Sequence, residues 1–165
     1  MKRILIIALG IIMLATGVAM ADSKPIQLSL TPGIAIFDRN TTIEGFSLGI
    51  WSENPQKAFA LGFANGSTGN SAGFSLGFLL NYADSYKGVQ WALVNYTQKN
   101  FVGWQSGFVN YAGQLTGLQL GFFNYAAKAS SGVQLGVINI IPQNKWFTNF
   151  PNELAPGMII FNWRF

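Results

Sequence analysis

A repeat of 14 or 15 residues constrains this chain more than any other feature. Successive units open on a glycine, at Gly73, Gly88, Gly103, Gly117 and Gly132. A glutamine follows two positions later in four of them, at Gln90, Gln105, Gln119 and Gln134. An asparagine stands near the end of each unit, at Asn81, Asn95, Asn110, Asn124 and Asn139. A fixed short period predicts a repetitive fold, either a stacked solenoid or an antiparallel meander of hairpins.

Within each unit the side chains alternate with a period of two, which predicts a β-strand. In the unit that opens at Gly117, the two faces of the strand carry Leu118, Leu120 and Phe122 on one side and Gln119, Gly121 and Phe123 on the other. One face is therefore large and apolar. The other is small or amide-bearing in its first half.

The length of the chain between strands bears on the choice between the two folds. A straight strand of ten residues is about 33 Å long, and the remaining five residues span at most about 18 Å. Such a linker allows a tight reversal but cannot return the chain to start a parallel strand, unless each strand is broken at its middle glycine. We therefore expect hairpins. The alternative is a β-solenoid of 14–15-residue repeats, which in-register Asn and Gln ladders would favour.

An antiparallel sheet with one apolar face must cover that face, and only 10% of the residues are charged. Closing the sheet into a barrel with the apolar face toward lipid removes both the sheet edges and the exposed face. The sequence thus predicts an all-β, antiparallel up-and-down barrel of about eight strands, or ten if the N-terminal region joins it. The expected strands are 44–52, 57–65, 73–83, 87–97, 102–112, 116–126, 130–141 and 156–165. Tyr82 and Tyr111 would then mark one membrane interface, and Tyr96 and Tyr125 the other.

The two ends of the chain carry further signals. Lys2 and Arg3, the apolar run 4–14 and the small residues Ala19 and Ala21 predict a secretory signal peptide over residues 1–21. Residues 22–43 are expected to form an N-terminal extension or extra strands, interrupted at Pro32-Gly33. Residues 44–165 are expected to form the repeat β-barrel domain.

The last ten residues alternate in the manner of a strand and end on an aromatic residue, with Phe161, Trp163 and Phe165 on one face. This pattern resembles the C-terminal strand signature of bacterial outer-membrane barrels, which implies recognition by the barrel assembly machinery. The repeat units from about Gly45 onward also resemble a bacterial family of surface repeat-containing proteins with GLQLGLVN-like units. That resemblance implies a repeat fold in the cell envelope, without a known reaction and without functional residues to transfer.

The glutamine column is the candidate functional feature. If the large face points outward, Gln90, Gln105, Gln119 and Gln134 point into the bore as a polar column that could hydrogen-bond a polar ligand. The alternative, which we favour, is that they satisfy one another and ordered water inside a filled barrel.

The amino-acid composition excludes most catalytic mechanisms. The chain has no His and no Cys, so His-based catalysis, thiol catalysis and most zinc sites are excluded. The carboxylates Glu53, Asp84 and Glu153 are expected in external turns as solvated charges, and the alternative is a weak cation site. After removal of residues 1–21, eight basic and six acidic residues remain without a basic stripe, so no nucleic-acid partner is expected.

These observations predict a non-enzymatic outer-membrane or cell-surface β-barrel with a structural or surface-contact role and no cofactor. Its partners would be outer-membrane lipid and the assembly machinery. The alternative is a secreted or surface-attached β-repeat module that acts in binding or adhesion.

Overall fold

The computed structural model describes residues 23–165, and the predicted signal peptide lies outside these residues. The described chain is all-β and contains no helix. Its strands are β1 (Ser23–Thr31), β2 (Ile34–Ala35), β3 (Thr42–Asn54), β4 (Lys57–Trp91), β5 (Val94–Ile140) and β6 (Gly157–Arg164). One sheet joins them all, in the order β2-β1-β3-β4-β5-β6.

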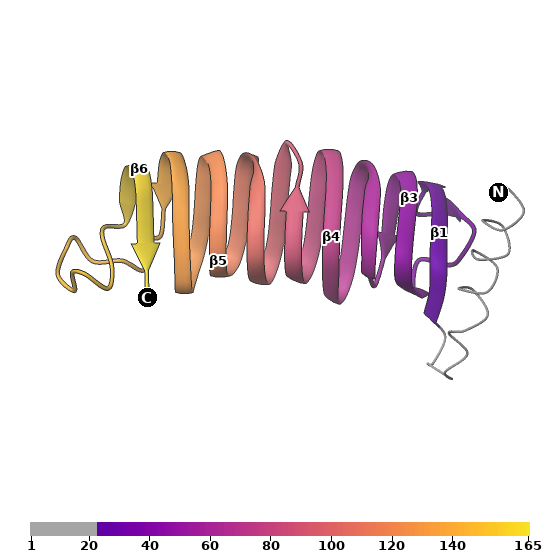
Figure 1. The fold of residues 1–165 in the computed structure, drawn as a ribbon, viewed down its shortest axis with the longest axis horizontal. Coiled ribbons are helices and arrows are strands. Elements are labelled where there is room, and N and C mark those ends of the chain that lie inside the picture. The colour runs from indigo at the N-terminus through magenta and orange to yellow at the C-terminus, as the bar shows by residue number, and fades with distance from the viewer. Residues whose placement is uncertain (1–22) are drawn as a thin grey trace, which may run out of the picture.

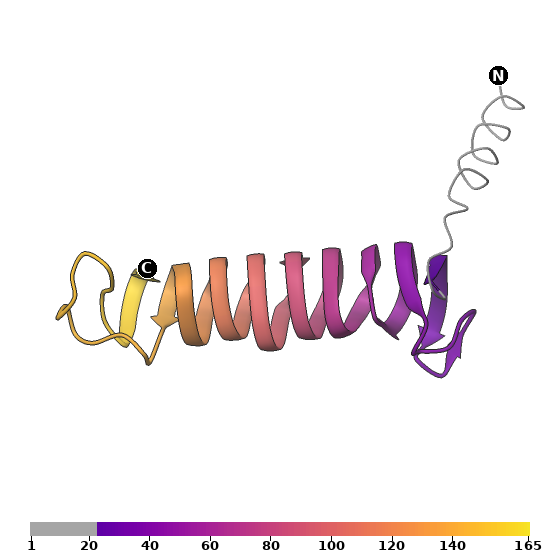
Figure 2. The same ribbon diagram turned by 90° about the horizontal axis from the view of Figure 1, so that it is seen from below.

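The strands wind as a coil instead of running up and down. Figures 1 and 2 show β4 and β5 as continuous ribbons that turn repeatedly about one long axis. β1 with β3, β3 with β4, and β4 with β5 all pair in parallel, and equivalent repeat positions face each other, such as Gly88 with Gly103 and Gln90 with Gln105. One repeat unit is therefore one turn of a β-solenoid. The predicted antiparallel barrel and its eight strands are wrong, and the solenoid alternative is confirmed.

A bend in the middle of each unit explains why the linker-length argument failed. In a straight strand consecutive side chains point to opposite faces, yet Phe78 and Leu79 are both exposed, and so are Phe122 and Phe123. The chain turns a corner at these pairs, directly after the middle glycine of the unit (Gly77 and Gly121 here). Each expected ten-residue strand is thus two short segments set at an angle, and a short linker can close the turn.

The glycines that open four successive units are required by the stacking of the turns. Gly73, Gly88, Gly103 and Gly117 have φ values of 128°, 134°, 133° and 125°. Residues with a side chain rarely adopt such angles. A Cβ at Gly88 would also collide with the carbonyl oxygen of Gly73 in the neighbouring turn. At Gly73, Gly88, Gly103 and Gly117 the backbone angle and the close approach of the preceding turn together require glycine.

The tyrosines that follow the asparagines form one column. The ring centroids of Tyr96 and Tyr111 are 4.7 Å apart, and those of Tyr111 and Tyr125 are 5.4 Å apart, with the planes nearly parallel. Tyr82 pairs in register with Tyr96. The predicted division of these residues between two membrane interfaces is therefore wrong, because parallel turns place equivalent residues on the same side.

The two ends of the coil are built differently. At the N-terminal end β1 forms a parallel turn against β3, and Pro32-Gly33 turns the chain into the short antiparallel strand β2. At the C-terminal end β6 lies antiparallel to the last part of β5, after a loop over residues 141–156. This strand closes that end of the coil, as Figure 1 shows.

The interior has two halves. One half contains the glutamine and asparagine side chains of the repeats. The other is a small apolar core formed by Ala83, Tyr86, Phe101, Ala112, Leu115, Ala126, Ala129 and Ile141. Burial of the Tyr86 phenol in this core raises its pKa.

Candidate functional site

The predicted glutamine column is a buried hydrogen-bonded ladder. Nε2 of Gln105 donates to Oε1 of Gln90 at 2.9 Å, and the same bond joins Gln119 to Gln105 and Gln134 to Gln119 at 2.8 Å each. The four side chains are at most 1% exposed. They bond to one another and to neighbouring groups of the interior, such as the carbonyl of Tyr125, so they do not face solvent where a ligand could reach them.

A second ladder runs through the asparagines. Nδ2 of each asparagine donates to Oδ1 of the next one along the chain, at 2.8–3.0 Å, in the series Asn65, Asn81, Asn95, Asn110, Asn124 and Asn139. Its donors point toward the C-terminal end of the coil, whereas those of the glutamine ladder point toward the N-terminal end. The glutamine ladder leaves one unpaired atom at each end, Nε2 of Gln90 and Oε1 of Gln134.

The large apolar side chains lie outside. Three columns run along the coil, each built from equivalent positions of successive turns. The first contains Phe46, Phe59, Phe74, Val89 and Trp104. The second contains Leu28, Leu48, Leu61, Leu76, Trp91 and Leu135, and the third contains Ile50, Phe63, Phe78, Leu93, Phe108, Phe122 and Val137. We call these three columns the apolar belt. Phe78 is 70% exposed.

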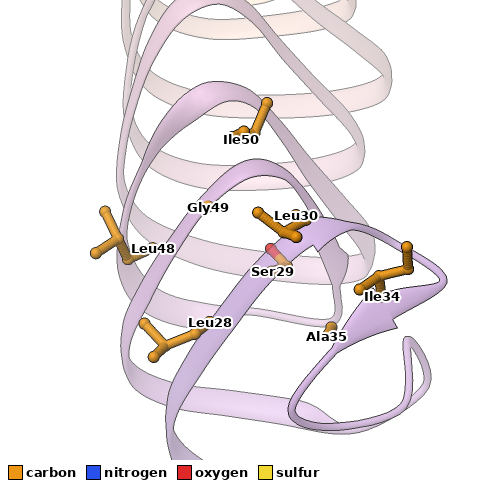
Figure 3. Close-up of a pocket in the computed structure, with 8 residues that line it drawn as sticks. All are labelled: Leu28, Ser29, Leu30, Ile34, Ala35, Leu48, Gly49 and Ile50. Atoms are coloured by element: carbon orange, nitrogen blue, oxygen red, sulfur yellow. The ribbon is translucent and has the colours of Figure 1, made fainter.

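A groove separates the second and third columns. Three cavities, of about 470, 620 and 620 Å³, lie along it. Their floors are the small middle residues of successive units: Gly49, Gly62, Gly77, Ala92, Gly107, Gly121 and Gly136. Figure 3 shows the first cavity, where Leu28, Leu30, Leu48 and Ile50 stand around Ser29 and Gly49.

The asparagine ladder explains why the floor is glycine. A Cβ on Gly121 would collide with the carbonyl oxygen of Gly107 and would meet the Asn110 amide at 2.5 Å. A Cβ on Gly77 would meet Oδ1 of Asn81 at 2.7 Å. The buried amides therefore force small residues at the corner, and these leave a groove between the two columns of large side chains.

Lysines lie both beside the belt and on the opposite side of the coil. Lys87 lies two residues before Val89 of the first column, so it projects from the same outer face. Lys99 lies six residues after Leu93 of the third column and five before Trp104 of the first, which places it on the side of the turn away from the belt, and Lys128 occupies the equivalent position two turns later. Lys87, Lys99 and Lys128 are exposed.

The carboxylates do not form a cation site. Glu53 pairs with Arg39 and accepts a hydrogen bond from Tyr82, Glu44 pairs with Lys57, and Glu153 pairs with Arg164. Asp84 accepts a hydrogen bond from the backbone N–H of Gly69 at 2.7 Å. Over residues 23–165 no group of three or more carboxylates could hold a metal ion.

The Tyr82 hydroxyl lies between Glu53 and Trp51, whose Nε1 donates to it at 2.8 Å. Partial burial, reinforced by the hydrogen bond to Glu53, raises the pKa of Tyr82 to about 12.

The predicted C-terminal strand residues take part in closing the coil. Phe161 pairs with Leu135 and Trp163 with Val133, while Asn162 between them is buried opposite Gln134. Nδ2 of Asn162 donates to the carbonyl of Ala155 at 2.9 Å. Phe165, the last residue, remains exposed.

Sequence reasoning missed the groove. The signal for the groove was present, because the middle position of the unit is glycine or alanine in nearly every turn. A small residue at this position produces a groove only because the chain bends directly after it, and the period-two alternation of the sequence does not reveal that bend.

No family model, curated protein or solved structure matches the chain. Within residues 23–165 there is no helix of the length and hydropathy that crossing a bilayer requires.

Proposed function

We propose that this chain is an exported, surface-attached β-repeat module that acts by binding through its apolar belt and is not an enzyme. The observation that carries the proposal is the inverted distribution of side chains, with amides inside and Leu, Phe and Trp outside. Soluble monomers rarely expose a contiguous apolar patch of more than a few hundred Å². A face of this kind marks a binding surface.

The remaining features fit a contact role. Each turn adds equivalent positions to the belt, most of them apolar, so the coil extends one surface in steps of about 4.8 Å. The carboxylates of the described residues are engaged in ion pairs and hydrogen bonds that support the fold. The predicted secretory signal and the resemblance of the repeats to surface repeat proteins support a place in the bacterial envelope, with the outer membrane as the proposed site.

Detergent partitioning tests the belt as a binding surface. In a phase-separating nonionic detergent the mature chain should enter the detergent phase, because the belt is covered there. A triple variant with Phe78→Ser, Phe108→Ser and Phe122→Ser should move to the aqueous phase with its circular dichroism unchanged.

A matched triple change on the polar side, with Gln98→Ser, Asn100→Ser and Ser130→Ala, should leave the partitioning of the chain as it is. Recovery of the unmodified chain as a monomer in the aqueous phase would contradict the proposal. Cell fractionation tests the location separately, with the chain expected in the outer-membrane fraction.

A further inference from the structure

We infer that the stacked tyrosines Tyr96, Tyr111 and Tyr125 are a site of oxidative modification, at which a one-electron oxidant joins neighbouring rings as dityrosine. The two pairs that react are Tyr96 with Tyr111 and Tyr111 with Tyr125. The oxidant is of the class formed by a peroxidase with hydrogen peroxide. The site uses residues outside the apolar belt, so the inference does not depend on the proposed function.

The parallel coil brings the reacting rings together. Equivalent residues of neighbouring turns lie about 4.8 Å apart, and the three tyrosine side chains project from the same side of the coil. The ring centroids of Tyr96 and Tyr111 are 4.7 Å apart, with planes 14° from parallel. Those of Tyr111 and Tyr125 are 5.4 Å apart, with planes 3° from parallel. The ortho carbons of each ring therefore lie next to the ring of the following turn.

Coupling requires a phenoxyl radical on each of two neighbouring rings. Each tyrosine gives one electron to the oxidant and releases its hydroxyl proton, and the unpaired electron that remains is shared between the oxygen and the ortho carbons. A carbon–carbon bond forms between one ortho carbon of each ring, and the two hydrogens on these carbons move to the phenolic oxygens. One molecule of hydrogen peroxide accepts the two electrons and two protons and leaves as two molecules of water.

The three tyrosines are within reach of an oxidant in solution. Tyr96 is 41% exposed, and Tyr111 and Tyr125 are half-buried. Because the partner ring is already held in place, coupling within the coil is intramolecular. A reaction between groups positioned in this way is much faster than one that depends on the encounter of separate molecules. Cross-links within one chain are therefore favoured over cross-links between chains.

The two other tyrosines of the chain have different surroundings. Tyr86 is 2% exposed and lies in the small apolar core. The Tyr82 hydroxyl donates to Glu53 and accepts from Nε1 of Trp51 at 2.8 Å. These two partners restrain the rotation of the ring that coupling to Tyr96 would need. We therefore expect neither of these tyrosines to be cross-linked.

Peroxidase treatment of the mature chain, followed by unfolding, trypsin digestion and mass spectrometry, tests the inference. Trypsin cuts after the lysines that flank the tyrosines, Lys87, Lys99 and Lys128. A bond between Tyr96 and Tyr111 should therefore join peptide 88–99 to peptide 100–128. A bond between Tyr111 and Tyr125 should lower the mass of peptide 100–128 by two hydrogen atoms. The oxidised chain should remain a monomer on a denaturing gel.

Single substitutions assign the products. Tyr111→Phe removes the residue that both pairs share and should abolish both products. Tyr96→Phe should abolish only the joined peptides. The matched control is Tyr82→Phe, which should leave both products. Each cross-link closes a loop of about 15 residues, so the oxidised chain should unfold at a temperature about 5–10 °C higher, whereas oxidised Tyr111→Phe should show no such rise.

Oxidation of the chain in concentrated urea separates the effect of stacking from that of sequence spacing. The yield of joined peptides should fall several-fold there, because the rings are no longer held together. An equal yield in urea would overturn the inference. So would dityrosine that forms only between separate chains, or joined peptides that persist in Tyr111→Phe. None of these outcomes bears on detergent partitioning, so the inference and the proposed function fail independently.

Discussion

Nδ2 of Asn110 donates a hydrogen bond of 2.8 Å to Oδ1 of Asn124, fourteen residues further along the chain and one turn further along the coil. The same Nδ2 lies 2.8 Å from the carbonyl oxygen of Leu120, and Oδ1 of Asn110 accepts from Asn95. One side chain therefore links three successive turns. The alignment of the turns is set by buried amides, whereas in most globular domains the interior is apolar.

Removal of Asn110 should strongly destabilise the coil. Asn110→Ala leaves the Asn95 amide without its ladder acceptor and the Asn124 carbonyl without its donor, and each buried unpaired group costs about 1–3 kcal/mol. We expect the free energy of unfolding in urea to fall by about 2–6 kcal/mol. Asn100→Ala, at an exposed position one turn earlier, should change it by less than about 0.5 kcal/mol. Similar losses for the two variants would contradict the ladder.

The opening glycine should not tolerate a methyl group. Gly88→Ala combines a φ of 134° with a collision against the carbonyl oxygen of Gly73. The unfavourable backbone conformation alone costs about 1–3 kcal/mol, and the collision adds to it. Thermal unfolding should therefore occur at a clearly lower temperature. At Gly33, where a Cβ meets no atom within 4 Å, alanine should leave the midpoint nearly unchanged. An unaffected Gly88→Ala variant would show that the turns do not stack this closely.

Arginine substitutions at two adjacent residues distinguish the inside of the coil from the outside. Gln119 is fully buried and accepts from Gln134, so Gln119→Arg buries an unpaired charge and should cost about 3–5 kcal/mol. Leu120→Arg projects outward and should change the free energy of unfolding by about 1 kcal/mol or less, while it weakens detergent partitioning. Denaturant titration of both variants provides the comparison. A larger loss of stability at Leu120 would reverse the assignment of the two faces.

Tyr82 predicts a loss of stability at high pH. Its pKa is about 12 in the folded chain and about 10 in the unfolded chain. Below pH 10 both the folded and the unfolded chain keep the Tyr82 proton, and the contribution of Tyr82 to the free energy of unfolding is fully present. Between pH 10 and 12 the unfolded state releases its proton first, so the free energy of unfolding falls as the pH rises. Tyr82→Phe should show a smaller fall over this window in urea titrations at each pH. A slope unchanged by the substitution would contradict the contribution of Tyr82.

The sequence predicts the repeat, its strand character and the contrast between the faces of each strand, because these follow from the spacing of residues such as Gln119 and Leu120. The regular spacing of the asparagines and glutamines also predicts the solenoid as an alternative fold. In the structure the spacing of the amides, and not the length of the linkers, determines the fold. Equivalent Asn and Gln side chains form hydrogen bonds along a ladder when neighbouring turns run parallel and in register, and these hydrogen bonds outweigh the preference of short linkers for hairpins.

The parallel orientation of neighbouring strands was not predicted, because the linker argument assumed straight strands. Glycine in the middle of a strand can mark a bulge, a bend or a close approach of another backbone, and the pattern alone does not say which. At Gly121 it marks a bend over the asparagine ladder. The groove and the single tyrosine column both follow from that bend, so both were missed together.

A designed disulfide tests the parallel coil most directly, since the chain has no cysteine of its own. Lys87 and Val102 are register partners on adjacent turns, and both are exposed. Under oxidising conditions the double variant Lys87→Cys with Val102→Cys should form an intramolecular disulfide in nearly all molecules. An antiparallel meander would place these residues at opposite ends of a strand of about 33 Å and would instead pair Val102 with Ala126. A disulfide in the variant with cysteines at 102 and 126, and none in the variant with cysteines at 87 and 102, would contradict the solenoid.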